Sequence, residues 1–120
     1  FMRVLIADDE ESIVRLLKKA LTKAGCAVET ATNGLELLEL WKISKPLTVL
    51  TDVNMPHMSG IDACQAIKAL NTRVKIILMT GSIESYDAAV AAMLWPVIKK
   101  PFSLPELTTL VLSSKTWRQS

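Results

Sequence analysis

Five polar side chains of this chain could do chemistry, since each of them ends or directly follows an apolar stretch. They are two adjacent carboxylates, a third carboxylate, a hydroxyl and an ammonium group: Asp8, Asp9, Asp52, Thr80 and Lys100. Three carboxylates gathered at one place repel one another and raise one another's pKa. A hard divalent cation would remove that repulsion, and a site with so few ligands suits Mg²⁺ better than Ca²⁺. A metal, a lysine and a hydroxyl that contact phosphoryl oxygens, with a carboxylate as nucleophile, suit phosphoryl transfer.

Strands must carry these five residues, because the stretches before them are short, apolar and rich in branched side chains. Such stretches predict strands at 3–8, 26–32, 47–53, 74–80 and 97–99. Apolar residues at helical spacing predict a helix after each strand; Gly25 ends the first helix, and the fourth covers about 84–93. The other three helices begin at capping pairs: Asn33 with Glu36, Ser59 with Asp62, and Ser103 with Glu106.

Five strands alternating with five helices predict a doubly wound α/β fold, a parallel sheet covered by helices on both faces. The first, third and fourth strands are the most continuously apolar, so we expect them in the centre. Pro96 beside the fifth strand favours an edge position. These constraints give the strand order 2-1-3-4-5. In such a sheet the ligand crevice lies at the carboxyl ends of strands one and three, where Asp8, Asp9 and Asp52 stand.

The overall composition favours one globular domain over residues 1–120, with a core at 3–114 and a tail or the start of a linker at 115–120. The chain is half apolar, and its 14 basic residues, against 12 acidic ones, are scattered, which argues against nucleic acid as a direct ligand. We expect no membrane span and no signal peptide, and hence a cytoplasmic location. Cys26 and Cys64 are interpreted as buried apolar residues, and Trp41 as part of the core.

Four motifs in this order resemble the receiver domain of two-component response regulators. They are the acidic pair at 8–9, T-D-V-N-M-P-H-M-S-G at 51–60, M-T-G at 79–81 and K-K-P-F at 99–102. The resemblance covers residues 3–114 and implies a flavodoxin-like, CheY-like (βα)5 sandwich. Each motif is common alone, but their combination at strand ends is specific.

The resemblance implies that Asp52 accepts a phosphoryl group from a sensor histidine kinase or a histidine phosphotransfer protein. It further implies a Mg²⁺ ion, with Mn²⁺ as an alternative, bound by the carboxylates of Asp9 and Asp52 and by the backbone carbonyl of Asn54. Asp8 would act mainly through bound water. Such a domain is a regulatory switch and not an enzyme in the ordinary sense, because it catalyses only its own phosphorylation and dephosphorylation.

The same resemblance assigns Thr80 and Lys100 to the phosphoryl group, through a hydrogen bond and an ion pair, and predicts a cis bond between Lys100 and Pro101. The switch would be read by a C-terminal effector domain, a partner protein or a second copy in a phosphorylation-linked homodimer. The expected output face consists of the fourth helix, the fifth strand and the fifth helix. We expect four side chains to be exposed there: Tyr86, Met93, Trp95 and Lys99.

One position departs from the family pattern. Receiver domains usually carry Tyr or Phe three residues before the lysine, and that ring turns inward on activation, whereas this chain has Val97. Valine has no ring and one dominant rotamer, so the aromatic part of the switch is missing. Trp95 is the aromatic side chain that lies nearest along the chain.

Three other functions compete with the phosphorylation switch. A degenerate receiver that binds partners without phosphorylation is supported by Val97. A flavin-binding protein of the same fold is disfavoured, because A-D-D-E at 7–10 offers carboxylates where a flavin phosphate needs hydrogen-bond donors. A Mg²⁺-dependent phosphatase is disfavoured too, because its general acid would stand two positions after Asp52, where Asn54 cannot titrate.

Overall fold

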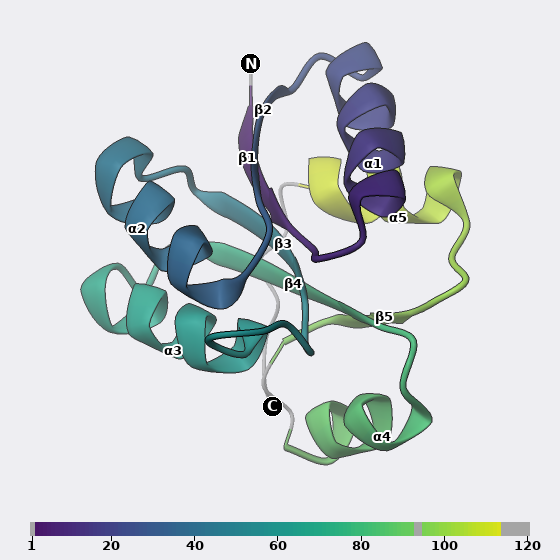
Figure 1. Ribbon diagram of the computed structural model, residues 1–120. Coiled ribbons are helices and arrows are strands. Elements are labelled where there is room, and N and C mark those ends of the chain that lie inside the picture. Colours follow the sequence, from purple (N-terminus) through teal and green to yellow (C-terminus); the bar gives the residue numbers. More distant parts are fainter. Residues whose placement is uncertain (1, 93–94, 114–120) are drawn as a thin grey trace.

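Strands and helices alternate along the whole computed structural model, which describes residues 2–92 and 95–113 (Figure 1). The number and order of the elements are as predicted. Their bounds are β1 Arg3–Ala7, α1 Glu11–Lys23, β2 Ala27–Ala31, α2 Gly34–Ser44, β3 Thr48–Asp52, α3 Gly60–Leu70, β4 Lys75–Thr80, α4 Ile83–Ala92, β5 Val97–Lys99 and α5 Leu104–Leu112.

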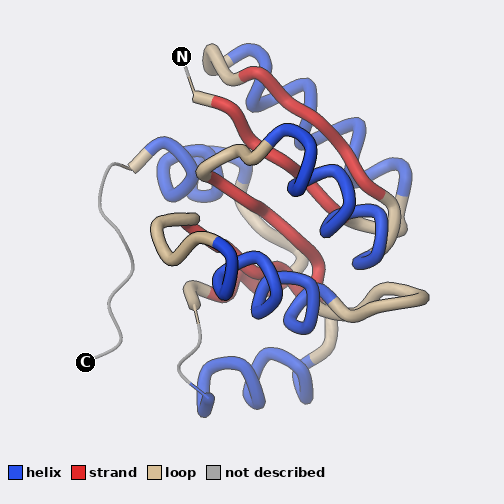
Figure 2. Tube along the Cα trace, turned by 90° about the vertical axis from the view of Figure 1, so that its left-hand side faces the viewer, coloured by secondary structure: helices blue, strands red, loops and turns tan. Residues whose placement is uncertain are grey.

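All five strands form one parallel sheet of order β2-β1-β3-β4-β5, which confirms the predicted order. The helices pack on both sides of the strands (Figure 2). Successive side chains of a strand point to opposite faces, so each central strand feeds both layers. Leu5 therefore packs with the α2 and α3 side chains, and its neighbour Ile6 packs with those of α1 and α5. This double burial explains why the central strands are continuously apolar.

Helix boundaries follow the predicted caps. The side chains of Asn33, Ser59 and Ser103 accept hydrogen bonds from the backbone amides three residues on, at 2.8, 3.1 and 3.4 Å. Gly25 follows α1 with a φ of 97°, a conformation that costs glycine little. Strand β1 ends one residue earlier than predicted, at Ala7, because Asp8 turns into the loop and its carboxylate accepts the Glu10 amide at 2.9 Å.

The two cysteines and Trp41 are buried, as the sequence predicted. Cys26 and Cys64 are free and buried, and Trp41 is buried, with its indole Nε1 donating to the Pro46 carbonyl at 2.9 Å. Within residues 2–92 and 95–113, no helix has both the length and the apolar character needed to cross a bilayer.

Candidate functional site

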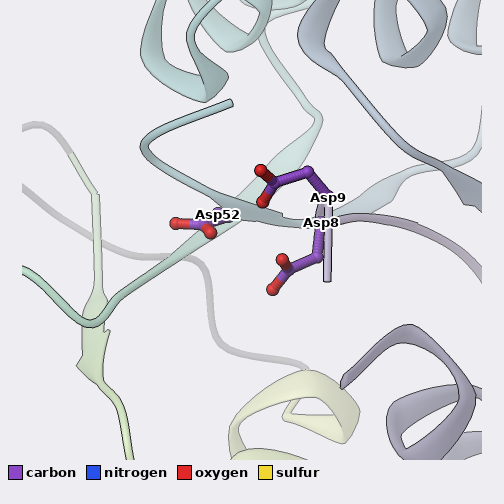
Figure 3. A group of neighbouring side chains, drawn as sticks. All are labelled: Asp8, Asp9 and Asp52. Carbon is purple, nitrogen blue, oxygen red and sulfur yellow. The ribbon is translucent and has the colours of Figure 1, made fainter. Parts of the chain in front are cut away.

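The acidic cluster lies where the carboxyl ends of β1 and β3 meet. Ala7 and Thr51 are register partners, so the residues that follow them, Asp8 and Asp52, come out side by side. Asp9 turns toward the same point, and oxygen atoms of all three carboxylates lie within 4.8 Å of one another (Figure 3). Asp8 and Asp52 are buried and Asp9 is exposed, so the cluster opens to solvent on the side of Asp9.

Lys100 reaches this cluster from the end of β5. Its Nζ lies 2.7 Å from Oδ2 of Asp8 and 3.2 Å from Oδ2 of Asp52, and its side chain is 12% exposed. A third carboxylate, that of the exposed residue Glu10, lies 3.5 Å from the same ammonium group. The Lys100–Pro101 peptide bond is cis, as the resemblance implied. Four of the five chemical groups singled out in the sequence are thus in one place.

Burial and charge shift the ionisation of Asp52 and Lys100. Burial raises the pKa of the Asp52 carboxyl, Lys100 opposes that change, the Asp8 charge adds to it, and the net direction is upward. Burial alone would lower the pKa of Lys100, but its hydrogen bonds and attraction to Asp8 and Asp52 outweigh burial and raise it. Ionised Asp52 therefore depends on a neighbouring positive charge.

The donor set fits a hard divalent cation. All the gathered ligand groups are carboxylate oxygens, within a span that one ion can bridge, and one of the three carboxylates faces solvent. Asn54 is the second residue of the loop after β3, and its amide lies 3.3 Å from Oδ1 of Asp52, so its backbone is close to the cluster.

Thr80 ends β4 beside this site, with its side chain fully buried. Its hydroxyl accepts a hydrogen bond from the Ser82 amide at 3.1 Å, and its carbonyl accepts one from the Lys100 amide at 2.8 Å. The hydroxyl thus holds the turn that leads into α4. Among the described residues, the Thr80 hydroxyl therefore has its hydrogen-bond partner outside the acidic cluster.

Two features of the site were missed by sequence reasoning. A Cβ on Gly60 would lie 1.9 Å from the Asp52 carbonyl oxygen, so only glycine lets α3 begin this close to the end of β3. Asn54 Nδ2 donates to Ser85 Oγ of α4 at 2.9 Å, which ties the site loop to that helix. A glycine in the first turn of a helix and an asparagine in a loop are both common, so the sequence held no clear signal for either.

The expected output face is only partly exposed. Lys99 is exposed as predicted, whereas Tyr86 and Trp95 are half-buried, and Met93 lies outside the described residues. Both Trp95 and Val97 pack against the apolar cluster that includes Ile76 and Leu78 of β4.

The carboxylate cluster lies where the strand order reverses, and a lysine from β5 joins it. These features define the class of doubly wound α/β proteins with an acidic site at the carboxyl edge of the sheet. The family model described as response regulator receiver domain matches residues 4–112. The chain therefore belongs to the receiver domain family of two-component response regulators.

Curated relatives agree with this assignment. The regulatory protein AtoC of Escherichia coli is 36% identical over 91% of this chain and 24% of its own length. The alkaline phosphatase synthesis transcriptional regulatory protein PhoP of Bacillus subtilis is 33% identical over 91% of this chain and 46% of its own length. The chain thus spans less than half the length of these relatives.

Solved receiver structures superpose along nearly the whole chain. The response regulator TrrA of Thermotoga maritima, in complex with Mg²⁺ and BeF, has a TM-score of 0.83 and 31% identity over 92% of this chain and 96% of its own. The chemotaxis protein CheY4 of Vibrio cholerae has a TM-score of 0.79 and 31% identity over 93% and 99% of the two chains. These neighbours confirm the flavodoxin-like fold.

Proposed function

We propose that this receiver domain is a phosphorylation-dependent switch in which Asp52 accepts the phosphoryl group. The supporting observation is the shared ammonium of Lys100, bonded to both Asp8 and Asp52 with the Asp9 carboxylate close by. The ammonium offsets the cost of keeping a buried carboxylate ionised, and an ionised carboxylate is the nucleophile that phosphoryl transfer needs. Residues 3–114 would form the functional unit.

A Mg²⁺ or Mn²⁺ ion belongs to this proposal. Asp9 and Asp52 would bind it through their carboxylates, Asn54 through its backbone carbonyl, and Asp8 mainly through a bound water molecule. When bound, the metal neutralises charge on the phosphoryl oxygens. The TrrA neighbour was solved in complex with Mg²⁺ and BeF, which supports a divalent metal as part of this proposal.

In the transfer step, a carboxylate oxygen of Asp52 attacks phosphorus while the bond from phosphorus to the donor's histidine nitrogen breaks. The histidine leaves with that electron pair, and Asp52 becomes an acyl phosphate. Lys100 would pair with the phosphoryl oxygens. The Thr80 hydroxyl would turn to donate to one of them and so give up its hydrogen bond to the Ser82 amide.

The donor would be a sensor histidine kinase or a histidine phosphotransfer protein. The phosphorylated state would pass through α4, β5 and α5 to an effector domain, a partner protein or a second copy. Because Val97 provides no ring, we infer that the turn from Thr80 to Ser85 at the start of α4 carries the change. The activity is limited to the domain's own phosphorylation and dephosphorylation.

A phosphorylation-independent binding domain is the second candidate, and Val97 favours it. To separate the two, the protein is treated with acetyl phosphate and Mg²⁺, and the phosphoryl adduct is measured by intact mass and by hydroxylamine release. We expect an adduct on the unmodified chain and on Asp62→Asn, an exposed carboxylate of α3, but none on Asp52→Asn. The proposal is contradicted if neither the unmodified protein nor Asp52→Asn forms an adduct, both with acetyl phosphate and with a cognate donor.

A further inference from the structure

The charges of this domain are separated between the two edges of the sheet. Every helix begins at the edge that holds the acidic cluster, and each has an acidic residue in its first turn. Helices α1, α2 and α3 end at the opposite edge with Lys23, Lys42 and Lys68 in their last turns. This arrangement complements the helix dipoles and leaves the amino edge of the sheet basic.

Two open hollows lie at that basic edge, on either side of Lys45. One, of about 490 Å³, is lined by Trp41, Lys42, Lys45, Leu70 and Asn71. The other, of about 600 Å³, is lined by Lys45 together with residues that start β1 and β3. We call the combined face the basal surface and define it by six residues: Arg3, Trp41, Lys42, Lys45, Leu47 and Leu70.

The turn at the centre of the basal surface is held in place. Its Lys45 has φ 49° and ψ 49°, and its amide donates to the Trp41 carbonyl at 2.7 Å. The buried Trp41 indole donates to the Pro46 carbonyl at 2.9 Å, and the Leu47 carbonyl accepts from the Lys75 amide at 2.8 Å. A partner would meet a surface that is already ordered, which lowers the entropy cost of binding.

The exposed side chains of the basal surface are apolar and cationic. Leu47 is 56% exposed and Leu70 61%, and each lines a different hollow. Lys42 and Lys45 are exposed and form no ion pair within residues 2–92 and 95–113, while Arg3 pairs at 3.6 Å with Glu29. A lysine placed between two apolar hollows complements a carboxylate placed between two apolar side chains.

Other occupants fit this surface less well. A nucleic acid backbone would meet the lysines but would leave Leu47 and Leu70 without apolar contacts. A second copy that presented the same surface across a two-fold axis would bring Lys42 and Lys45 against their own equivalents.

We propose that the basal surface binds an extended protein segment that carries a carboxylate between two apolar side chains. Thr48 lines one hollow, and Asp52 ends the same strand, roughly 13 Å away at about 3.3 Å per residue. This surface is thus separate from the acidic cluster, and the proposal does not depend on phosphorylation. The domain would hold one partner at its basal surface and exchange phosphoryl groups at the opposite edge.

The probe is a synthetic peptide with the core Leu-Asp-Glu-Leu between Gly and Ser spacers, added to ¹⁵N-labelled chain. We expect amide shifts at residues 41–48 and 70–71, and at least tenfold weaker binding of a matched peptide with Lys in place of Asp and Glu. The double variants Lys42→Glu with Lys45→Glu, and Leu47→Ser with Leu70→Ser, should each weaken binding at least tenfold. Two exposed residues off the surface provide matched controls, Lys19→Glu and Ile43→Ser, and these should bind as the unmodified chain does.

Each variant must keep the amide spectrum of the acidic edge, so that loss of binding is not loss of fold. Shifts confined to the acidic edge, or unchanged peptide binding by both double variants, would overturn the proposal. So would a short DNA duplex that produces the same shifts more strongly than the peptide. Sedimentation velocity tests the remaining occupant. If the unmodified chain self-associates and the charge-reversed double variant does not, the surface binds a second copy and the proposal is wrong.

Discussion

Asn54 and Ser85 are joined by a side-chain hydrogen bond of 2.9 Å, from the asparagine Nδ2 to the serine Oγ. The bond connects the loop after β3 with the first turn of α4. Two further bonds continue from it: the Ser85 amide donates to Ser82 Oγ at 3.2 Å, and the Ser82 amide donates to Thr80 Oγ1 at 3.1 Å. With the Asn54 amide 3.3 Å from Asp52, these bonds link the proposed phosphoacceptor to Thr80 through the start of α4.

Removing the Ser85 hydroxyl should loosen the first turn of α4. In Ser85→Ala, we expect faster hydrogen exchange at the amides of Ser85 and Tyr86, with a global stability loss below about 1 kcal/mol because the bond is exposed. Ser44→Ala is the matched control. The hydroxyl of Ser44, at the end of α2, donates to Glu29 at 2.8 Å, and its loss should leave α4 unchanged. Equal exchange rates in α4 for both variants would show that the Asn54–Ser85 bond does not order the helix.

The sheet order could be predicted from the sequence because each central strand is buried on both faces. Alternating residues such as Leu5 and Ile6 enter different cores, and this leaves an uninterrupted apolar run that only an inner parallel strand requires. The position of Asp8 was less predictable. Its place in the loop depends on the hydrogen bond to the Glu10 amide, a choice between strand and turn that the run of residue types does not determine.

The acidic cluster was predictable for the same topological reason, since the carboxyl ends of β1 and β3 must meet once the order is known. The contacts that hold the surrounding elements together could not be predicted from the sequence. Lys75 at the start of β4 has the sequence context of a solvent-exposed lysine, yet it reaches the end of α5, more than thirty positions later. Such a contact depends on how α5 packs across the sheet, which no local pattern encodes.

Lys75 is expected to stabilise the end of α5. Its Nζ donates to the carbonyls of Leu110, Val111 and Ser113 at 2.6, 3.2 and 2.6 Å, and so supplies donors to a helix end that lacks them. Lys75→Met should lower the free energy of unfolding by about 1–3 kcal/mol, which is the contribution expected from hydrogen bonds made by a charged group. It should also speed hydrogen exchange in the last turn of α5.

Lys68→Met is the matched control for this loss, because the Lys68 ammonium makes one exposed bond, to the Thr72 carbonyl at 2.7 Å. Urea unfolding should show a loss below about 0.5 kcal/mol for this variant, as for most surface substitutions. If the two lysine variants lose equal stability, Lys75 does not hold the end of α5.

Gly60 should tolerate no side chain. A Cβ there would lie 1.9 Å from the Asp52 carbonyl oxygen, a backbone atom that cannot move without displacing the end of β3. Gly60→Ala should therefore lower the free energy of unfolding by about 3 kcal/mol or more, in the upper range for single substitutions, and move the amide resonances of residues 51–54.

Gly81→Ala tests whether that effect is local. The nearest atoms to a Cβ at Gly81 are Cβ and Cδ of Lys100, at 3.9 and 4.0 Å, which is ordinary contact. We expect its unfolding free energy to stay within about 1 kcal/mol of the unmodified chain in urea titrations. Comparable losses for the two alanine variants would contradict the close approach of α3 to β3.

Asp52 should reduce the stability of the metal-free domain at neutral pH. Its pKa is raised in the folded state, chiefly by burial, so between the unfolded and folded pKa values the folded state binds more protons. Stability then falls as pH rises through that window, and the loss is complete above the folded pKa, where Asp52 is ionised in both states. Asp52→Asn removes this effect, and we expect its melting temperature in EDTA to exceed that of the unmodified chain by about 2–5 °C at neutral pH.

The difference in melting temperature should shrink as pH falls through the folded pKa and vanish below the ordinary Asp pKa of about 4, because the carboxyl is then protonated in both states. Adding Mg²⁺ should raise the melting temperature of the unmodified chain more than that of Asp52→Asn, since the metal would offset the charge that burial disfavours. Circular dichroism melts of both chains at both pH values, with and without Mg²⁺, measure these melting temperatures. A lower melting temperature for Asp52→Asn in EDTA at neutral pH would mean that attraction to Lys100 exceeds the cost of burial, and the raised pKa would then be wrong.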